Sequence, residues 1–183
     1  IYRTMKEKKD IYIEAPTGTG KTISTMFPAL KALSMYPNAK LVYLTAKNIT
    51  KTVAEETLTI LRNKGLKLKT LTLTAKDKIC FLEERSCNGE DCIYARGHFD
   101  RVNDAMLDLL ENHEALTQEL IMEYGKKYTV CPFELSLDLI QWSDLVIGDY
   151  NYFFDPKAMI KRLEFDDTPY IFLIDEAHNL VDR

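Results

Sequence analysis

A glycine-rich stretch, Glu14–Thr22 with the sequence EAPTGTGKT, constrains the fold of this chain more than any other segment. It lies between a short apolar run, Ile11–Ile13, and a segment with helical spacing that begins near Ile23. A strand, a glycine-rich loop and a helix in this order are typical of a phosphate-binding loop, whose backbone N–H groups and helix dipole face an anion. We therefore predict a nucleoside triphosphate site. Ala15 stands where the usual pattern G-x-x-x-x-G-K-[ST] has its first glycine.

The end of this stretch carries the groups that would bind the nucleotide. Lys21 can reach the outer phosphates, and the hydroxyl of Thr22 can bind magnesium. The residues expected to contact the nucleotide are Pro16, Thr17, Gly18, Thr19, Gly20, Lys21 and Thr22. The alternative is a glycine-rich turn with a chance Lys-Thr pair, which the flanking apolar run and helical pattern disfavour.

An acidic motif near the end of the sequence supplies the partner that a phosphate loop requires. Asp175, Glu176 and His178 directly follow the apolar run 170–174. That run predicts a buried strand, whose carboxyl end would place Asp175 where it can bind magnesium. Glu176 could then orient and deprotonate the water that attacks the γ-phosphate. The alternative, a chance acidic pair on the surface, is disfavoured by the strand that precedes it.

Strand-like and helix-like segments alternate along most of the chain. Short apolar runs predict strands, and segments with apolar residues every three or four positions predict helices. The predicted strands are 40–45, 68–74, 145–148 and 170–174, and the predicted helices of the first part are 23–35 and 48–61. This order is typical of an α/β fold with a parallel sheet and helices on both faces.

The pattern changes at Lys76, and we interpret the segment 76–132 as a mostly helical insertion. Apolar residues keep a helical period from Phe99 to Tyr124, as one helix broken near Asn112 or as two helices. The segment also contains all the cysteines of the chain, spaced C-x6-C-x4-C-x38-C: Cys80, Cys87, Cys92 and Cys131. This spacing does not match paired C-x-x-C zinc knuckles. An iron–sulfur cluster, a zinc ion and unrelated buried thiols all remain open, because thiolates suit both metals.

Composition and charge limit the class of protein further. The chain has 183 residues, of which 46% are hydrophobic, enough for one ordinary domain with a core and an insertion. It contains neither a leader sequence nor a long apolar run, so we expect a soluble cytoplasmic protein without a membrane span. We also expect a fragment, because a phosphate-loop domain normally has structure before its first strand and further strands after the acidic motif.

The net charge of −4 is unevenly distributed. Basic residues predominate from Lys40 to Lys78, whereas acidic residues predominate from Glu83 to Glu119. A nucleic-acid backbone would be attracted to the first of these segments and repelled by the second. Two solvated faces of opposite sign are the alternative interpretation.

The motifs together resemble those of the XPD/DinG family of superfamily 2 DNA helicases. The resemblance rests on EAPTGTGKT, VYLTAKN, a four-cysteine insertion ending in Cys-Pro-Phe-Glu, GDYNYFFDP and DEAHNL, in this order. It implies a partial RecA-like P-loop NTPase domain, the first motor domain, formed by residues 1–75 and 133–183. It also implies that residues 76–132 hold a four-iron four-sulfur cluster. The family couples ATP hydrolysis to 5′ to 3′ movement along single-stranded DNA, in repair or replication.

The resemblance also implies roles for individual residues. Lys21 and Thr22 match the phosphate and magnesium contacts, and Asp175, Glu176 and His178 match the DEAH box. The expected cluster ligands are Cys80, Cys87, Cys92 and Cys131, and the expected DNA contacts are Thr45, Lys47 and Lys76. The implied cofactors are ATP, magnesium and the cluster, and the implied partners are single-stranded DNA and duplex junctions.

Other parts of such a helicase have no counterpart in this sequence. The resemblance implies an arch domain and a second motor domain with an arginine finger elsewhere in the same polypeptide, which we expect to be a monomer. Because that arginine contributes roughly 10³- to 10⁵-fold to the hydrolysis rate of related enzymes, this chain alone should be almost inactive. The alternative is a DNA-binding or redox-sensing iron–sulfur module that does not unwind DNA and whose nucleotide site is structural.

Overall fold

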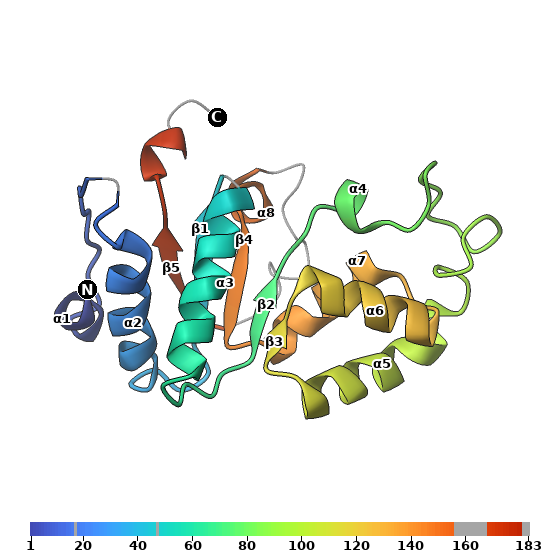
Figure 1. The fold of residues 1–183 in the computed structure, drawn as a ribbon, viewed down its shortest axis with the longest axis horizontal. Coiled ribbons are helices and arrows are strands. Elements are labelled where there is room, and N and C mark those ends of the chain that lie inside the picture. Colours follow the sequence, from blue (N-terminus) through green and yellow to red (C-terminus); the bar gives the residue numbers. More distant parts are fainter. Residues whose placement is uncertain (17, 47, 156–167, 181–183) are drawn as a thin grey trace. The chain divides into compact units, whose positions relative to one another are not determined.

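The computed structural model describes residues 1–16, 18–46, 48–155 and 168–180 (Figure 1). The chain divides into two compact units, one formed by residues 1–67 and 147–183 and the other by residues 68–146. Their strands belong to a five-stranded sheet with the order β3-β2-β4-β1-β5. The predicted α/β class with a parallel sheet is confirmed. The predicted boundaries of the insertion, 76 and 132, stay a prediction.

The first unit contains the strands and helices that surround the glycine-rich stretch. Its elements are α1 (Tyr2–Lys6), α2 (Lys21–Leu33), β1 (Lys40–Thr45), α3 (Asn48–Arg62), α8 (Asn151–Phe154), β5 (Tyr170–Ile174) and the 3₁₀ helix η3 (Ala177–Leu180). β4 (Leu145–Asp149) begins in the second unit and ends in the first. β1 and β5 pair in parallel, from Lys40 opposite Tyr170 to Leu44 opposite Ile174.

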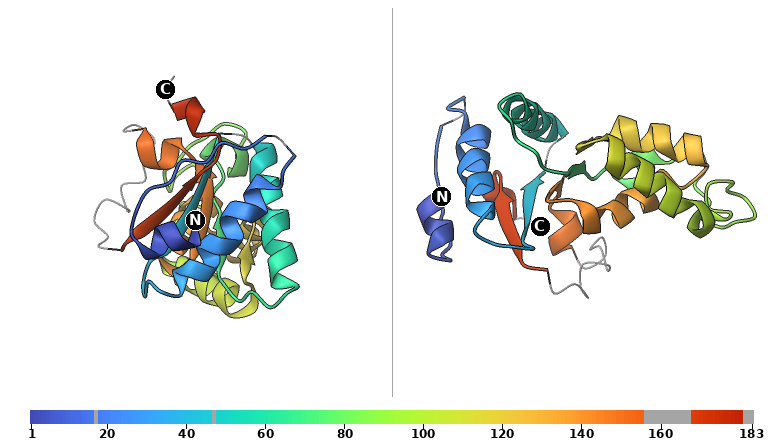
Figure 2. Two further views of the ribbon diagram at one scale, coloured as in Figure 1. Left: turned by 90° about the vertical axis from the view of Figure 1, so that its left-hand side faces the viewer. Right: turned by 90° about the horizontal axis from the view of Figure 1, so that it is seen from below.

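Helices cover both faces of the β1–β5 pair. α2 and α3 contact β1 and each other, and they lie side by side in both views of Figure 2. On the opposite face, Val42 and Leu44 pack against Tyr150, with Phe153 beside them. β1 is buried on both faces because Leu41, Val42 and Leu44 are fully covered. This explains why the sequence of β1 is a continuous apolar run and does not alternate between apolar and polar residues.

The second unit is mostly helical. Its elements are β2 (Thr70–Thr72), α4 (Lys76–Ile79), α5 (His98–Asn112), β3 (Ala115–Leu116), α6 (Gln118–Tyr128), α7 (Pro132–Asp138) and the 3₁₀ helix η1 (Leu139–Trp142). Two long side chains satisfy the carbonyl groups at helix ends. Lys69 donates to the carbonyls of Leu110 and His113, at 2.5 and 2.6 Å, and Arg101 donates to those of Tyr128 and Thr129, at 3.0 and 2.7 Å.

Strand β3 was not expected within the helical pattern. It pairs with β2 in parallel, with Thr70 opposite Ala115 and Leu71 opposite Leu116. The stretch from 99 to 124 therefore forms two helices, as one of the alternatives predicted, with a strand between them. Leu116 fits the apolar helical spacing, but it is buried in the sheet, and α6 begins only after Thr117, whose hydroxyl accepts from the Leu120 N–H.

The predicted strand at Ile11–Ile13 is wrong. These residues have no strand assignment, and Ile11, Tyr12 and Ile13 are 49%, 95% and 53% exposed. A short apolar run becomes a strand only when it pairs with a neighbouring strand, because its backbone groups otherwise stay bonded to water. Among the described residues, β5 pairs with β1 and with no other strand. Residues 11–13 therefore have no strand to pair with.

Candidate active site

The loop before α2 has the backbone conformation that glycine permits. Gly18 and Gly20 have φ angles of 79° and 73°, in the left-handed region that other residues rarely adopt. A Cβ on Gly18 would meet nothing within 4 Å, and one on Gly20 would lie 3.6 Å from Ile23 Cγ2. The glycines are therefore required by the turn and not by crowding. The Thr19 hydroxyl donates to the Pro16 carbonyl at 2.8 Å, whereas Thr17 lies outside the described residues.

An ion pair joins the loop to the acidic motif across 155 residues of sequence. Lys21 Nζ lies 2.9 Å from Glu176 Oε1, and the two side chains are 31% and 36% exposed. The hydrogen bond to Glu176 raises the pKa of Lys21, and partial burial opposes that rise. The fold thus places the predicted phosphate-binding lysine and the predicted general base in direct contact, although their roles stay predictions.

Glu176 has an unusual backbone conformation. Its φ is 52°, which is uncommon for a residue other than glycine and costs conformational energy. Asn179 stabilises the turn, since its backbone N–H and its side-chain amide donate to the Glu176 carbonyl at 3.0 and 2.9 Å. His178 Nδ1 lies 3.5 Å from Glu176 Oε2 on an exposed side chain. The turn therefore orients the Glu176 carboxylate toward both Lys21 and His178.

Asp175 is held at the end of β5 by two neighbouring elements. Its N–H donates to the Leu44 carbonyl of β1 at 2.9 Å, and the Tyr150 hydroxyl donates to its backbone carbonyl. The hydroxyl of Tyr43, on β1, is buried and has no hydrogen-bond partner among the described residues. Burial, and then the charge of Asp175, raise the pKa of Tyr43, while Thr22 acts in the opposite direction. Tyr43, Thr22 and Asp175 are thus close enough to influence one another.

These residues fit a magnesium–nucleotide complex. Among the described residues, no group of three or more His, Cys, Asp or Glu side chains is placed to hold a metal ion. Magnesium does not need such a group, because it commonly binds through one or two protein oxygens, substrate phosphates and water. Thr22 and Asp175 offer two such oxygens, and the buried hydroxyl of Tyr43 is a polar group without a partner beside them.

The four cysteines do not form a ligand group in this structure. All are free thiols: Cys92 is buried, Cys80 and Cys131 are half-buried, and Cys87 is exposed. No cluster of potential metal ligands is found in the part of the chain that is described. Burial raises the pKa of the Cys131 thiol, and its backbone N–H donates to His98 Nδ1 at 3.2 Å. The arrangement therefore does not fit a cluster as it stands.

The residues expected to contact DNA lie in different settings. Thr45 is 1% exposed at the end of β1, so its side chain is not on the surface. Lys47 lies outside the described residues. Lys76 lies 3.8 Å from Glu134 Oε1 and 5.0 Å from the centre of the Phe133 ring. Its amino group therefore interacts within its own unit.

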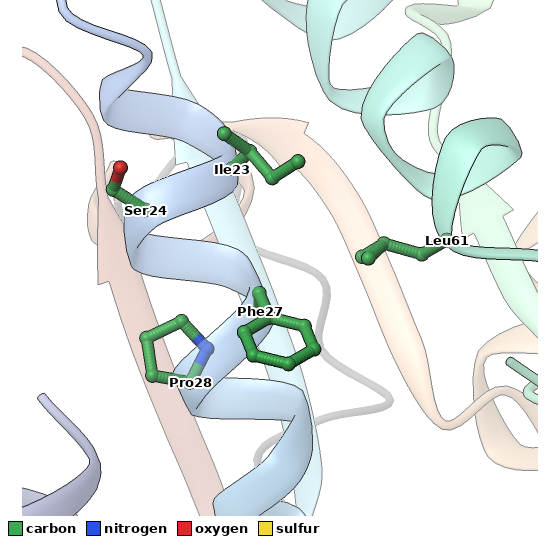
Figure 3. A pocket seen from close by; sticks show the side chains of 5 residues that line it. All are labelled: Ile23, Ser24, Phe27, Pro28 and Leu61. Carbon is green, nitrogen blue, oxygen red and sulfur yellow. The ribbon is translucent and has the colours of Figure 1, made fainter. Parts of the chain in front are cut away.

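An apolar groove of about 490 Å³ lies between α2 and α3 (Figure 3). It is lined by Ile23, Ser24, Phe27, Pro28 and Leu61. Phe27 and Pro28 project from the side of α2, and Leu61 extends toward them from α3. None of these residues belongs to the predicted nucleotide site.

Comparison with solved structures shows that the α/β fold is similar to that of the XPD helicase domain. The structure matches one titled "Truncated XPD" with a TM-score of 0.63 over 98% of this chain and 51% of the other, at 22% identity. It matches another titled "XPD_Helicase" with a TM-score of 0.67 over 98% of this chain and 31% of the other, also at 22% identity. The chain belongs to the DEAD_2 family, whose family model matches residues 41–183.

Relatives of known function agree with this family. The chain is 26% identical to the yeast Saccharomyces cerevisiae "General transcription and DNA repair factor IIH helicase subunit XPD/RAD3", over 98% of this chain and 27% of the relative. It is 25% identical to the Caenorhabditis briggsae "Regulator of telomere elongation helicase 1 homolog", over 94% of this chain and 22% of the relative. The predicted resemblance to XPD helicases is confirmed. The chain spans about a quarter of the length of these relatives.

The described residues contain no helix that is both long and apolar enough to cross a bilayer. The expected cytoplasmic location stays a prediction.

Proposed function

We propose that this chain is the ATP-binding part of the first motor domain of a DNA helicase. The helicase would couple ATP hydrolysis to 5′ to 3′ movement along single-stranded DNA and to duplex unwinding, in repair or replication. The observation that carries this proposal is the 2.9 Å contact between Lys21 and Glu176, which joins the glycine-rich loop to the acidic motif. Membership of the DEAD_2 family and the named helicase relatives support it.

In the proposed reaction the residues of this chain bind and orient the nucleotide. The positive φ angles of Gly18 and Gly20 let backbone N–H groups face the phosphates, and Lys21 binds the outer phosphates. Thr22 and Asp175 would hold magnesium, which neutralises charge on the phosphates when it is bound. Pro16, Thr17 and Thr19 complete the loop.

Glu176 has the role of general base. Lys21 exchanges Glu176 for a phosphate when ATP binds, and the released carboxylate then orients the attacking water and accepts its proton. His178 Nδ1 lies 3.5 Å from that carboxylate, so the histidine would respond when the carboxylate moves and could transmit this movement to the rest of the motor. The second motor domain, which together with an arch domain would lie elsewhere in the same polypeptide, would supply the arginine finger, so this chain alone would hydrolyse ATP very slowly.

The proposed DNA partners are single strands and duplex junctions. We assign the backbone contacts to Thr45 at the end of β1, to Lys47, which follows two residues later in the sequence, and to Lys76, four residues before the first cysteine. Thr45 would act through its backbone groups, because its side chain is buried. Lys76 would exchange Glu134, which lies at 3.8 Å, for a phosphate.

We further propose that Cys80, Cys87, Cys92 and Cys131 bind a four-iron four-sulfur cluster. The support is their number, their confinement to one segment, and the lack of long helices or strands between Cys80 and Gly97. Such a segment can move its thiols together when metal binding supplies part of the folding energy.

The cluster is tested on anaerobically purified full-length protein by its absorption spectrum with iron and sulfide content. Four iron and four sulfide per chain are expected, and Cys131→Ser should lose the chromophore and unwinding while keeping part of the ATPase activity. Ser86→Ala, next to Cys87, is the matched control and should keep the iron. A content of one zinc ion per chain without iron would contradict the proposed iron–sulfur cluster.

Helicase activity is tested with the full-length protein on duplexes that carry a single-stranded tail. A 5′ tail should support ATP-dependent strand separation, and a 3′ tail should not. Glu176→Gln serves as the inactive control. Tight DNA binding without strand separation on either substrate would instead favour a DNA-binding or redox-sensing module whose nucleotide site is structural.

A further inference from the structure

Tyr43 occupies a position where a tyrosine hydroxyl needs an explanation. It lies in the middle of β1 and is 2% exposed, between Val42 and Leu44, which are completely buried. Because alternate residues of a strand point to opposite faces, Tyr43 faces away from the Tyr150 cluster that covers Val42 and Leu44. Its face is the one that α2 covers, and its hydroxyl reaches Thr22 at the start of that helix.

The hydroxyl of Tyr43 has no hydrogen-bond partner in the described part of the chain. Most buried hydroxyl groups are hydrogen-bonded, because burying one without a partner is unfavourable. A phenylalanine would fill the same space without this cost. The polar groups nearest the hydroxyl are Thr22 on α2 and Asp175 at the end of β5, whereas the charge of Tyr150 acts on it only from the other face of β1.

The Tyr43 hydroxyl can donate a hydrogen bond to one of these neighbours, because a tyrosine hydroxyl carries its proton at neutral pH. Leu44 of β1 lies opposite Ile174 of β5, so the Asp175 carboxylate that follows is near this hydroxyl and can accept the bond. Thr22 and Asp175 are also the two residues to which the proposed function assigns magnesium, and Tyr43 is the residue that lies beside both.

We propose that Tyr43 is a positioning residue of the nucleotide site, whose hydroxyl donates a hydrogen bond to the Asp175 carboxylate and orients it for magnesium. This inference rests on the proposed function, because it assumes that Asp175 binds magnesium. Tyr150 would hold the backbone of the same residue through the Asp175 carbonyl. Two tyrosines thus fix one aspartate, one through its side chain and one through its backbone, without touching the nucleotide.

The test is Tyr43→Phe in the full-length protein, measured by calorimetric titration with the non-hydrolysable β,γ-imido analogue of ATP. Loss of a group that orients a metal ligand typically lowers metal affinity by at least about 10-fold, so the magnesium concentration for half-maximal binding should rise by about that factor. Binding of the analogue in excess chelator should stay within about 2-fold, because Lys21 and the loop are intact. Tyr128→Phe, which removes a hydroxyl bonded to Asp108, is the matched control and should not alter the magnesium requirement.

Thermal unfolding without ligand separates this role from a structural one. The Tyr43→Phe protein should unfold at the same temperature as wild type or higher, because the change removes a buried polar group without a partner. A lower unfolding temperature with unchanged magnesium dependence would overturn the inference while leaving the proposed function intact. Absence of any magnesium-dependent binding in wild type would overturn both.

Discussion

Replacing Glu176 by glutamine should separate nucleotide binding from hydrolysis. In this structure the Glu176 carboxylate binds Lys21 at 2.9 Å, so it competes with the phosphate that Lys21 is proposed to bind. Glutamine keeps the shape of the side chain but removes its charge and its ability to accept a proton. The variant should therefore bind ATP at least as well as wild type and fail to hydrolyse it.

The expected gain in affinity for ATP is small, because the Lys21–Glu176 ion pair that the substitution removes is partly exposed to solvent. The side chains of Lys21 and Glu176 are 31% and 36% exposed, so water and salt screen the pair considerably. The measured free energies of exposed ion pairs are small, and they change a binding constant by at most about fivefold. We expect the affinity for Mg-ATP to rise by about 1.5- to 5-fold at low salt, and less at high salt. The hydrolysis rate should fall by about 10²- to 10⁴-fold, the usual contribution of a general base.

The assay is a titration with a fluorescent ATP analogue, together with phosphate release, at two salt concentrations. Glu14→Gln is the matched control, because it removes an exposed carboxylate near the loop without breaking the ion pair. Affinity should change more for Glu176→Gln than for this control. A loss of affinity in Glu176→Gln, or hydrolysis within a few-fold of wild type, would refute the reasoning.

Two further predictions concern stability. Gly20→Ala should lower the free energy of unfolding by about 1–2 kcal/mol, because alanine is strained at a φ of 73°; Gly89→Ala, at an ordinary φ, is the control in urea unfolding. Hydrogen bonds from Lys127 and Tyr128 lower the pKa of Asp108, so its contribution to stability should be complete above its unfolded pKa of about 4 and disappear as the pH falls through the lower folded value. The difference in urea midpoint between wild type and Asp108→Asn should be constant from pH 7 to 5 and shrink toward pH 2; a constant difference throughout would contradict the role of the charge.

Elements with a strong local pattern could be predicted from the sequence. β1 and β5 have the predicted bounds, 40–45 and 170–174, because each is a continuous apolar run. The helix predicted at 48–61 ends one residue later, at Arg62, and the one predicted at 23–35 begins at Lys21 and ends at Leu33. The prediction that 170–174 is a buried strand is correct for the strand but wrong for its burial, because no residue of β5 is buried and Phe172 and Ile174 are 40% and 37% exposed.

Elements that depend on a distant partner could not be predicted. The run at 11–13 has the composition of a strand, but its state depends on whether another strand lies beside it. Conversely, β3 has only two residues, and only the position of β2 makes them a strand. Pairing between segments of this kind is not encoded in local periodicity.

The same distinction applies to the site. Spacing and order singled out Lys21 and Glu176, which the fold brings together. Tyr43, Tyr150 and Asn179 were missed, because a tyrosine in a buried run is indistinguishable from a core residue until its hydroxyl is located. The sequence alone does not indicate that Asn179 stabilises the left-handed turn at Glu176, because this role depends on where its side chain lies.

The most direct test of the proposed nucleotide site is ATP hydrolysis by the full-length protein with and without single-stranded DNA, in wild type and Lys21→Ala. Wild type should hydrolyse ATP and be stimulated by DNA. Lys21→Ala should lose this activity but keep its fold, followed by circular dichroism, and its DNA binding. The lysine is partly exposed, and its ion pair within the described part of the chain is with Glu176. ATP turnover within a few-fold of wild type in Lys21→Ala would contradict the assignment of the phosphate loop.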